Sequence, residues 1–201
     1  MISDKEIMEV IGNILKQREP VAIPDPHGAY KHASVLIPLT VEEGVCNLIL
    51  TKRTDTVEHH KGQISFPGGR VDDGDRSLEF TALREAEEEI GLQRNDVEVL
   101  GRIDDALTIV SNFIIHAYVG MIPPYYPFRL SEAEVERILR VPLALFFTSM
   151  QDNYSFEFEG MAIKTPALVY GKDVIWGATA RIMKNFVAIF DGKLPLKQAE
   201  K

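Results

Sequence analysis

The stretch that decides the fold runs from residue 66 to residue 92 and reads FPGGRVDDGDRSLEFTALREAEEEIGL. Its second half predicts a helix over residues 77–90, because apolar residues recur at helical spacing and a glycine follows as the C-terminal cap. With about 3.6 residues per turn, three carboxylates share one face of this helix: Glu85, Glu88 and Glu89. Carboxylates at this spacing repel one another, and a divalent cation would remove the repulsion.

Carboxylate oxygens are hard ligands, so the expected cofactor is Mg²⁺ or Mn²⁺, which proteins bind through carboxylates, water and substrate phosphates. The glycine-rich loop before the helix lets backbone N–H groups approach a phosphate. The alternative interpretation is a solvated acidic face, which is common on surface helices. The loop and the helix together favour the metal site.

This pattern resembles the Nudix box, which reads Gly, x5, Glu, x7, Arg-Glu-aliphatic-x-Glu-Glu-x-Gly-aliphatic. The second half matches from Arg84 to Leu92, with Ala86 at the aliphatic position. In the first half, counted from Gly69, Asp75 stands where the motif has Glu, and the spacing to Arg84 is one residue longer.

The resemblance implies a role for each acidic residue of the helix. Glu85 and Glu89 would be the principal metal ligands, and Glu88 a further ligand or a base. Arg84 would brace the loop, since it lies about 100° from Glu85 around the helix. The implied reaction is attack of water on phosphorus in a nucleoside diphosphate linked to another group.

The segment upstream resembles that of Nudix coenzyme A pyrophosphatases, Leu-Leu-Thr-x-Arg-Ser-x3-Arg-x3-Gly-x3-Phe-Pro-Gly-Gly. Residues 49–69 keep this spacing, but Glu58 stands where the subgroup has Arg. The implied substrate is coenzyme A or a derivative, cleaved to 3',5'-ADP and 4'-phosphopantetheine. An arginine that ends a strand beside a glycine loop also suits phosphate recognition. The expected substrate-binding residues are Arg53, His60, Gly62, Gly68 and Gly69.

Two of these assignments have alternatives. Glu134 follows Ser131 by three residues, which predicts either a helix-capping pair or the additional carboxylate that many Nudix proteins place near the metals. His59 and His60 could contact phosphate, or they could be solvated loop residues.

Three functions are compatible with these residues. The first is hydrolysis of coenzyme A or its thioesters. The second is the same chemistry on another nucleoside diphosphate derivative, such as ADP-ribose or a dinucleotide. The third is a nucleotide sensor that binds without cleaving, against which the intact acidic set argues.

The remaining elements are read from periodicity and turn signals. Strands are predicted at residues 34–39, 45–50, 97–103, 107–110, 113–121, 154–158 and 167–170. Helices are predicted from Ser3 to before Glu19, from Ser131 up to Pro142, and after Gly177. Residues 54–74 predict a long loop, and loops of this length inside compact domains are usually functional or disordered.

Strands mixed with segregated helices indicate an α+β fold, a Nudix-like α/β/α sandwich with a mixed sheet between helices. We expect one domain over residues 1–201, with residues 1–33 as an N-terminal helix and loop extension.

Composition excludes several classes of protein. The 201 residues include 30 acidic and 22 basic ones, a net charge of −8, so a broadly basic nucleic-acid-binding surface is not expected. The single cysteine, Cys46, excludes an intrachain disulfide and a cysteine-built zinc site. The N-terminus lacks the pattern of a signal peptide, and no apolar run approaches the ~18–20 residues of a membrane span. We therefore expect a cytoplasmic protein without nucleic-acid or membrane partners, and a homodimer is possible.

Overall fold

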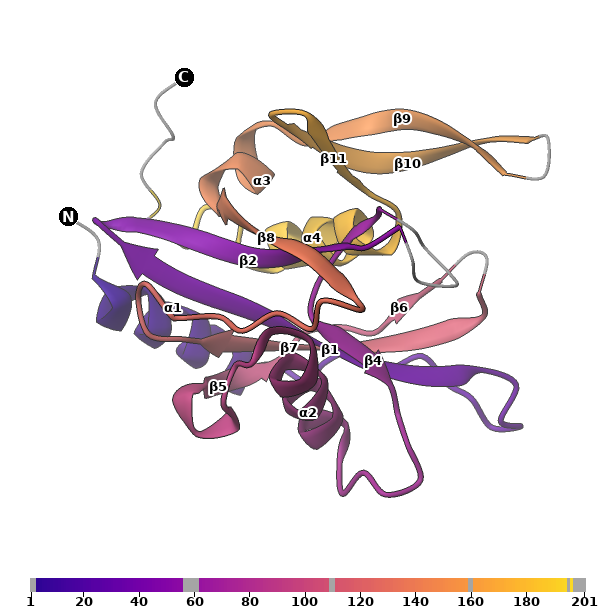
Figure 1. The fold of residues 1–201 in the computed structure, drawn as a ribbon, viewed down its shortest axis with the longest axis horizontal. Helices are drawn as coiled ribbons and strands as arrows, with labels where there is room; N and C mark the ends of the chain where they lie inside the picture. Colours follow the sequence, from indigo (N-terminus) through magenta and orange to yellow (C-terminus); the bar gives the residue numbers. More distant parts are fainter. Residues whose placement is uncertain (1–2, 56–61, 109–110, 159–160, 195, 197–201) are drawn as a thin grey trace.

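The computed structural model describes residues 3–55, 62–108, 111–158, 161–194 and 196 (Figure 1). The chain opens with α1 (Asp4–Lys16), which Ser3 caps through a reciprocal capping box with Glu6. The helix predicted after Ser3 is therefore confirmed.

An eight-stranded mixed sheet follows, with the path β3-β2-β1-β7-β5. Its strands are β1 (Lys31–Glu42), β2 (Val45–Arg53), β3 (Ile64–Ser65), β4 (Gly68–Arg70), β5 (Glu98–Arg102), β6 (Ala106–Leu107), β7 (Phe113–Met121) and β8 (Val135–Pro142). The β1–β7 pair is parallel, and the other pairs are antiparallel. β4 pairs with β1, β6 with β7 and β8 with β2.

The remaining elements are α2 (Leu78–Ile90), the short 3₁₀ helix η1 (Arg94–Asp96), α3 (Ala144–Thr148), β9 (Gln151–Phe158), β10 (Met161–Tyr170), β11 (Asp173–Trp176) and α4 (Gly177–Phe190). β9, β10 and β11 form a second, three-stranded antiparallel sheet (Figure 1). α4 buries the face that its periodicity predicts, which consists of Thr179, Ile182, Met183, Phe186 and Phe190.

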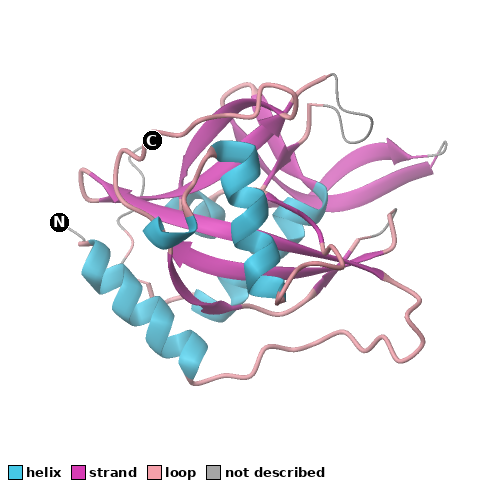
Figure 2. Cartoon of the chain, turned by 60° about the horizontal axis from the view of Figure 1, so that its bottom comes forward, coloured by secondary structure: helices cyan, strands magenta, loops and turns pink. Residues whose placement is uncertain are grey.

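Helices cover both faces of the main sheet (Figures 1 and 2). Alternation along β1 places Leu36 in a cluster with Ala86 of α2, whereas Ile37 packs in a larger cluster with Ile11 of α1 and Phe186 of α4. The predicted α+β architecture, a mixed sheet between helices, is confirmed.

The helix predicted from Ser131 to Pro142 is wrong. Ser131 opens a single turn, in which its carbonyl accepts from the amides of Glu134 and Val135 at 2.9 and 2.8 Å. The chain then continues as β8, which pairs along almost the whole of β2. Burying Val135, Leu139 and Val141 in this pairing outweighs the local capping signal.

Residues 54–74 are also more regular than predicted. β3 pairs with β2 and β4 pairs with β1, so the loop is anchored at two places. Gly68 and Gly69 carry no side chain whose alternation could have signalled a strand. The elements β11 and α3 were not predicted, and β9 and β10 extend beyond the predicted ranges. No helix in the described part of the chain is long and apolar enough to cross a membrane.

Candidate active site

The glycine loop fits tightly between β1 and α2. Gly69 pairs with Ser34 and Gly68 pairs with Val35. A Cβ atom on Gly68 would lie 2.5 Å from the Ser34 carbonyl oxygen, and one on Gly69 would lie 2.4 Å from the Glu85 carboxylate. Because both positions are glycine, the backbone of the loop can approach the acidic helix closely.

Asp75 joins the loop to the helix. Its carboxylate accepts from Arg84 Nε at 2.9 Å and Nη2 at 3.0 Å, a bidentate arrangement, and from the Thr81 hydroxyl at 2.8 Å and the Asp72 amide at 3.0 Å. The hydrogen bonds from Arg84 hold the pKa of Asp75 well below its usual range, despite burial. Asp75 thus holds the loop and the arginine, although the spacing of the motif is one residue longer than in the Nudix box.

We predict that Asp75→Asn destabilises the fold by about 2–4 kcal/mol at pH 7, because Arg84 loses a bidentate ionic partner. The pKa of Asp75 is lower in the folded than in the unfolded chain, so its contribution is present at neutral pH and is lost as pH falls below about 4. Urea denaturation at pH 7 and pH 3 measures this, with the exposed neighbour Asp73→Asn as control. A loss of unfolding free energy in Asp75→Asn that is equal at pH 7 and pH 3 would contradict the ionic role of Asp75.

The three carboxylates of α2 differ in exposure and partners. Glu89 is buried, with 4% of its side chain exposed, and accepts from the Gly68 amide at 3.3 Å. Glu85 forms an ion pair with Arg84 at 2.9 Å, and Glu88, which is 59% exposed, forms one with the same arginine at 3.1 Å. The structure therefore brings Glu85, Glu88 and Glu89 to one side of the helix beside the glycine loop.

Burial governs the electrostatics of this cluster. It raises the pKa of Glu89 to about 8, against the opposing effect of Arg53, and repulsion from Glu85 and Glu134 adds to the rise. Burial also raises the pKa of Glu85, although the Arg84 guanidinium opposes it.

Glu134 lies in the turn before β8, where its carbonyl accepts from the Thr54 amide at 3.0 Å. The interpretation of Glu134 as the capping residue of a long helix fails together with that helix. Its carboxylate is close enough to raise the pKa of both Glu85 and Glu89. The structure thus brings a fourth carboxylate towards the cluster from a different element.

Arg53, at the end of β2, places Nη1 at 3.5 Å from Glu89. Its Nε is buried and has no hydrogen-bond partner among the described residues. Gly62 adopts a left-handed φ of 64°, which favours glycine. His59, His60 and Glu58 lie outside the described residues.

The donor set suits a hard divalent cation. In the described part of the chain, no three His, Cys, Asp or Glu side chains already converge on one point for a metal ion. Arg84 instead holds Glu85 and Glu88, and Arg53 is a counter-charge to Glu89. A buried carboxylate repelled by two others is the environment that a cation relieves, so the residues fit Mg²⁺ or Mn²⁺.

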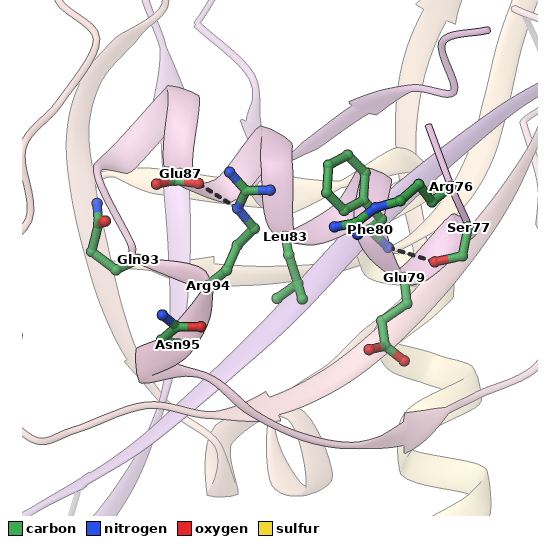
Figure 3. A pocket seen from close by; sticks show the side chains of 9 residues that line it. All are labelled: Arg76, Ser77, Glu79, Phe80, Leu83, Glu87, Gln93, Arg94 and Asn95. Carbon is green, nitrogen blue, oxygen red and sulfur yellow. Dashed lines mark hydrogen bonds and ion pairs between the residues drawn. The ribbon is translucent and has the colours of Figure 1, made fainter. Parts of the chain in front are cut away.

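A pocket of about 620 Å³, drawn in Figure 3, lies on the side of α2 that faces away from the three carboxylates Glu85, Glu88 and Glu89. The guanidinium groups of Arg76 and Arg94 lie 4.6 and 5.0 Å from the centre of the Phe80 ring, and Arg94 forms an ion pair with Glu87. The pocket is lined by none of the expected site residues, because the side chains of Phe80 and Glu87 project from the other face of the helix.

Comparison with known proteins agrees with this geometry. The family model described as "NUDIX domain" matches residues 30–155, well over half of the chain. The chain belongs to the Nudix family. The matched segment contains the glycine loop, α2 and Glu134.

Relatives and a solved structure support the same assignment. The chain is 35% identical over 154 residues to a protein of Photorhabdus laumondii named "Uncharacterized Nudix hydrolase NudL", covering 76% of this chain and 81% of the relative. A protein of Yersinia pestis with the same name is 35% identical over 160 residues, covering 77% of each chain. A MutT/nudix family protein from Enterococcus faecalis shares the fold, with a TM-score of 0.55 and 15% identity over 95% of this chain and 76% of that one. This Nudix protein is accordingly a hydrolase.

Sequence reasoning missed two features of this region. The hydrogen bond from the Gly68 amide to the Glu89 carboxylate joins two residues that are 21 positions apart in the sequence, and no local sequence pattern indicates it. The contact between the rings of His32 and His116 also carried no motif.

Proposed function

We propose that this Nudix hydrolase is a metal-dependent pyrophosphohydrolase that cleaves coenzyme A or its derivatives to 3',5'-ADP and 4'-phosphopantetheine. The observation that carries the proposal is the buried Glu89 carboxylate, which lies beside Glu85 and the glycine loop. The two carboxylates are hard metal ligands, and the backbone of the loop next to them can approach a diphosphate.

The roles of the residues follow from their positions. Glu85, Glu89 and Glu88 would hold Mg²⁺ or Mn²⁺, which when bound neutralises charge on phosphoryl oxygens and lowers the pKa of water. Glu134 would add a carboxylate to this set. Arg84, held by Asp75, would keep the loop in place.

The remaining groups would bind the diphosphate. Arg53 offers a buried N–H group without a partner among the described residues, and the loop at Gly68 and Gly69 offers close approach of backbone. Gly62 and His60 would complete this side. In the reaction, the water oxygen would bond to phosphorus and the bridging P–O bond would break. Glu88, the most exposed of the three carboxylates, would take the proton of the water if it acts as the base and not as a further metal ligand.

Coenzyme A is the favoured substrate because residues 49–69 keep the spacing of the coenzyme A subgroup. ADP-ribose is the second candidate, because Glu58 replaces the arginine of that subgroup and reverses its charge. The complete acidic set favours either over a sensor without catalysis.

A substrate panel tests the proposal. Coenzyme A, dephospho-coenzyme A, ADP-ribose and a dinucleotide are incubated with the protein and Mg²⁺ or Mn²⁺, and products are separated by chromatography. We expect 3',5'-ADP from coenzyme A with the highest kcat/KM of the set. Activity on ADP-ribose alone would overturn coenzyme A as the substrate, but the assignment of pyrophosphohydrolase activity would still hold.

The substitution Glu58→Arg tests the position that departs from the subgroup. If it faces the 3'-phosphate, a new charge-assisted contact worth about 1–3 kcal/mol should lower KM for coenzyme A. KM for dephospho-coenzyme A and ADP-ribose, which lack that phosphate, should change much less. Equal shifts on all three substrates would rule out contact with the 3'-phosphate.

We also propose that the whole chain forms one hydrolase domain, including the N-terminal extension. In support, Ile7 and Ile11 of α1 pack in the same core as Phe186 and Phe190 of α4.

A further inference from the structure

The pocket on the other side of α2 is lined by side chains that the candidate active site does not use. Its volume of about 620 Å³ falls within the range of roughly 300–1,000 Å³ that is typical of small-molecule sites. Figure 3 shows that its two ends differ: Arg76 and the Phe80 ring lie at one end, and the amides of Gln93 and Asn95 lie at the other. Leu83 lies between them.

The Phe80 ring holds two guanidinium groups in place. The guanidinium carbons of Arg76 and Arg94 lie over the ring, 4.6 and 5.0 Å from its centre. An arginine that stacks on an aromatic face is restrained by the stacking but keeps its N–H donors free in the plane of the guanidinium. The ring therefore orders two cationic groups without using their hydrogen-bond donors.

Most donors of these two arginines have no partner within the described part of the chain. Among those residues, Arg76 forms no ion pair and no hydrogen bond. Arg94 forms an ion pair with Glu87 through Nε at 2.5 Å, and its Nη1 and Nη2 groups have no hydrogen-bond partner there. The carboxylate of Glu79, the other acidic residue of the lining, points away from the Phe80 ring (Figure 3). One guanidinium of the pocket thus lacks a counter-charge.

A phosphate group is the ligand that these donors suit. Its oxygens accept two parallel N–H bonds from one guanidinium, and such charge-assisted pairs are among the strong hydrogen bonds of proteins. Arg94 offers the edge formed by Nη1 and Nη2, and Arg76 offers all of its donors. Because both guanidinium groups are already restrained by one ring, less side-chain entropy is lost when the phosphate binds.

The other end of the pocket offers hydrogen bonds to a planar base. The Asn95 side chain has no hydrogen-bond partner among the described residues, and the Gln93 amide bonds only to the Gly91 carbonyl, at 3.5 Å. A side-chain amide carries a donor and an acceptor side by side, which matches the edge of adenine. Leu83, between the two ends, gives the ligand an apolar surface.

We propose that this pocket binds a nucleotide, with its phosphate on Arg76 and Arg94 and its base on Gln93 and Asn95. The site goes beyond the proposed function, because none of the residues assigned to hydrolysis lines it. The body of α2 separates the pocket from the acidic face. The nucleotide bound here is therefore a second ligand, distinct from the substrate held at the glycine loop.

Isothermal titration calorimetry of the whole, EDTA-treated protein tests this site. AMP is the probe, because it carries one phosphate and one base and no diphosphate to be cleaved. We expect AMP to bind, inorganic phosphate to bind more weakly, and adenosine to show no measurable binding. Arg76→Gln should weaken AMP binding by about 10- to 100-fold, since charge-assisted contacts are lost. Arg129→Gln, which changes an exposed arginine outside the pocket, should bind AMP like the wild type.

A second variant, Asn95→Ala, separates the contact with the base from the contact with the phosphate. It should weaken the binding of AMP by about 3- to 10-fold, because a neutral hydrogen bond is lost, and leave the binding of inorganic phosphate unchanged. An equal loss for both ligands, or inorganic phosphate that binds the wild type as tightly as AMP does, would overturn the assignment of a nucleotide.

Absence of AMP binding to the wild type, or unchanged affinity in Arg76→Gln, would overturn the site itself. A loss of affinity confined to Arg53→Gln would place AMP at the acidic face instead. Arg76 and Asn95 are exposed, and thermal unfolding of each variant checks that it folds. Because the titration uses neither metal nor a cleavable substrate, failure of this site is distinguishable from failure of the proposed function.

Discussion

Glu89→Gln should remove most of the hydrolytic activity while making the metal-free protein more stable at pH 8. The change keeps size and hydrogen-bonding capacity but removes the charge that would hold the metal. Substitutions of residues that only orient metal ligands already cost 10- to 100-fold, so loss of a ligand should lower kcat by roughly two orders of magnitude or more.

The gain in stability follows from the raised pKa of Glu89. In the unfolded chain the carboxyl ionises near pH 4.5, whereas in the fold it keeps its proton to about pH 8. Between these values the folded state binds more protons, so the stability of the wild type falls as pH rises through this window, by up to a few kcal/mol. Glutamine never ionises, so the variant escapes this loss.

Thermal unfolding of EDTA-treated wild type and Glu89→Gln at pH 5, 7 and 8 measures the effect. The two melting temperatures should be close at pH 5 and diverge towards pH 8 in favour of the variant. Glu87→Gln is the matched control, because Glu87 lies on the other face of α2 and pairs with Arg94. Near wild-type turnover in Glu89→Gln would show that Glu89 is no ligand, and a variant less stable at pH 8 would contradict the burial argument.

Gly69→Ala should also remove most of the activity, while Gly74→Ala in the same loop should not. The Cβ that the first substitution adds would lie 2.4 Å from the Glu85 carboxylate, so that side chain must move away from its position. We expect a fall in kcat/KM of about 100-fold and a higher metal concentration for half activity, as a displaced ligand predicts. A Cβ at Gly74 meets nothing within 4 Å.

The two variants, Gly69→Ala and Gly74→Ala, are compared by steady-state kinetics at varied Mg²⁺ concentration and by thermal unfolding. Gly74→Ala should keep full activity, with stability unchanged or raised by about 0.4–1 kcal/mol, since alanine restricts the unfolded chain. Equal activity in both variants would show that close packing of the loop against Glu85 is dispensable.

Local signals in the sequence predicted the elements that depend on neighbours along the chain. α2 begins at the Ser77 cap and ends at Gly91 in a left-handed conformation, as its caps indicate. The capping pattern at Ser131 gave a wrong prediction, because the pairing of β8 with β2, 82 to 95 residues earlier in the chain, outweighed the local helical signal. Distant pairing of this kind has no local pattern, which is also why β4, paired with β1 at separations of 33 to 37 residues, was missed.

In the candidate site too, features that depend on neighbouring residues could be predicted, whereas contacts between distant residues could not. Helical spacing alone placed Glu85, Glu88 and Glu89 together, and the structure agrees. The motif spacing left the role of Asp75 undefined, because an extra loop residue can be absorbed while its carboxylate still reaches Arg84. His32 and His116 are 84 residues apart, so the fold was needed to bring them into contact.

Metal dependence of product formation tests the central claim most directly. Protein stripped with EDTA and transferred to metal-free buffer is assayed for release of 3',5'-ADP from coenzyme A and of AMP from ADP-ribose, before and after addition of Mg²⁺ or Mn²⁺. Glu89→Gln is assayed in parallel. The account predicts no product without metal, recovery of the wild type when either metal is added, and no recovery of the variant. Full hydrolysis by the stripped wild type, or equal recovery of Glu89→Gln, would contradict it.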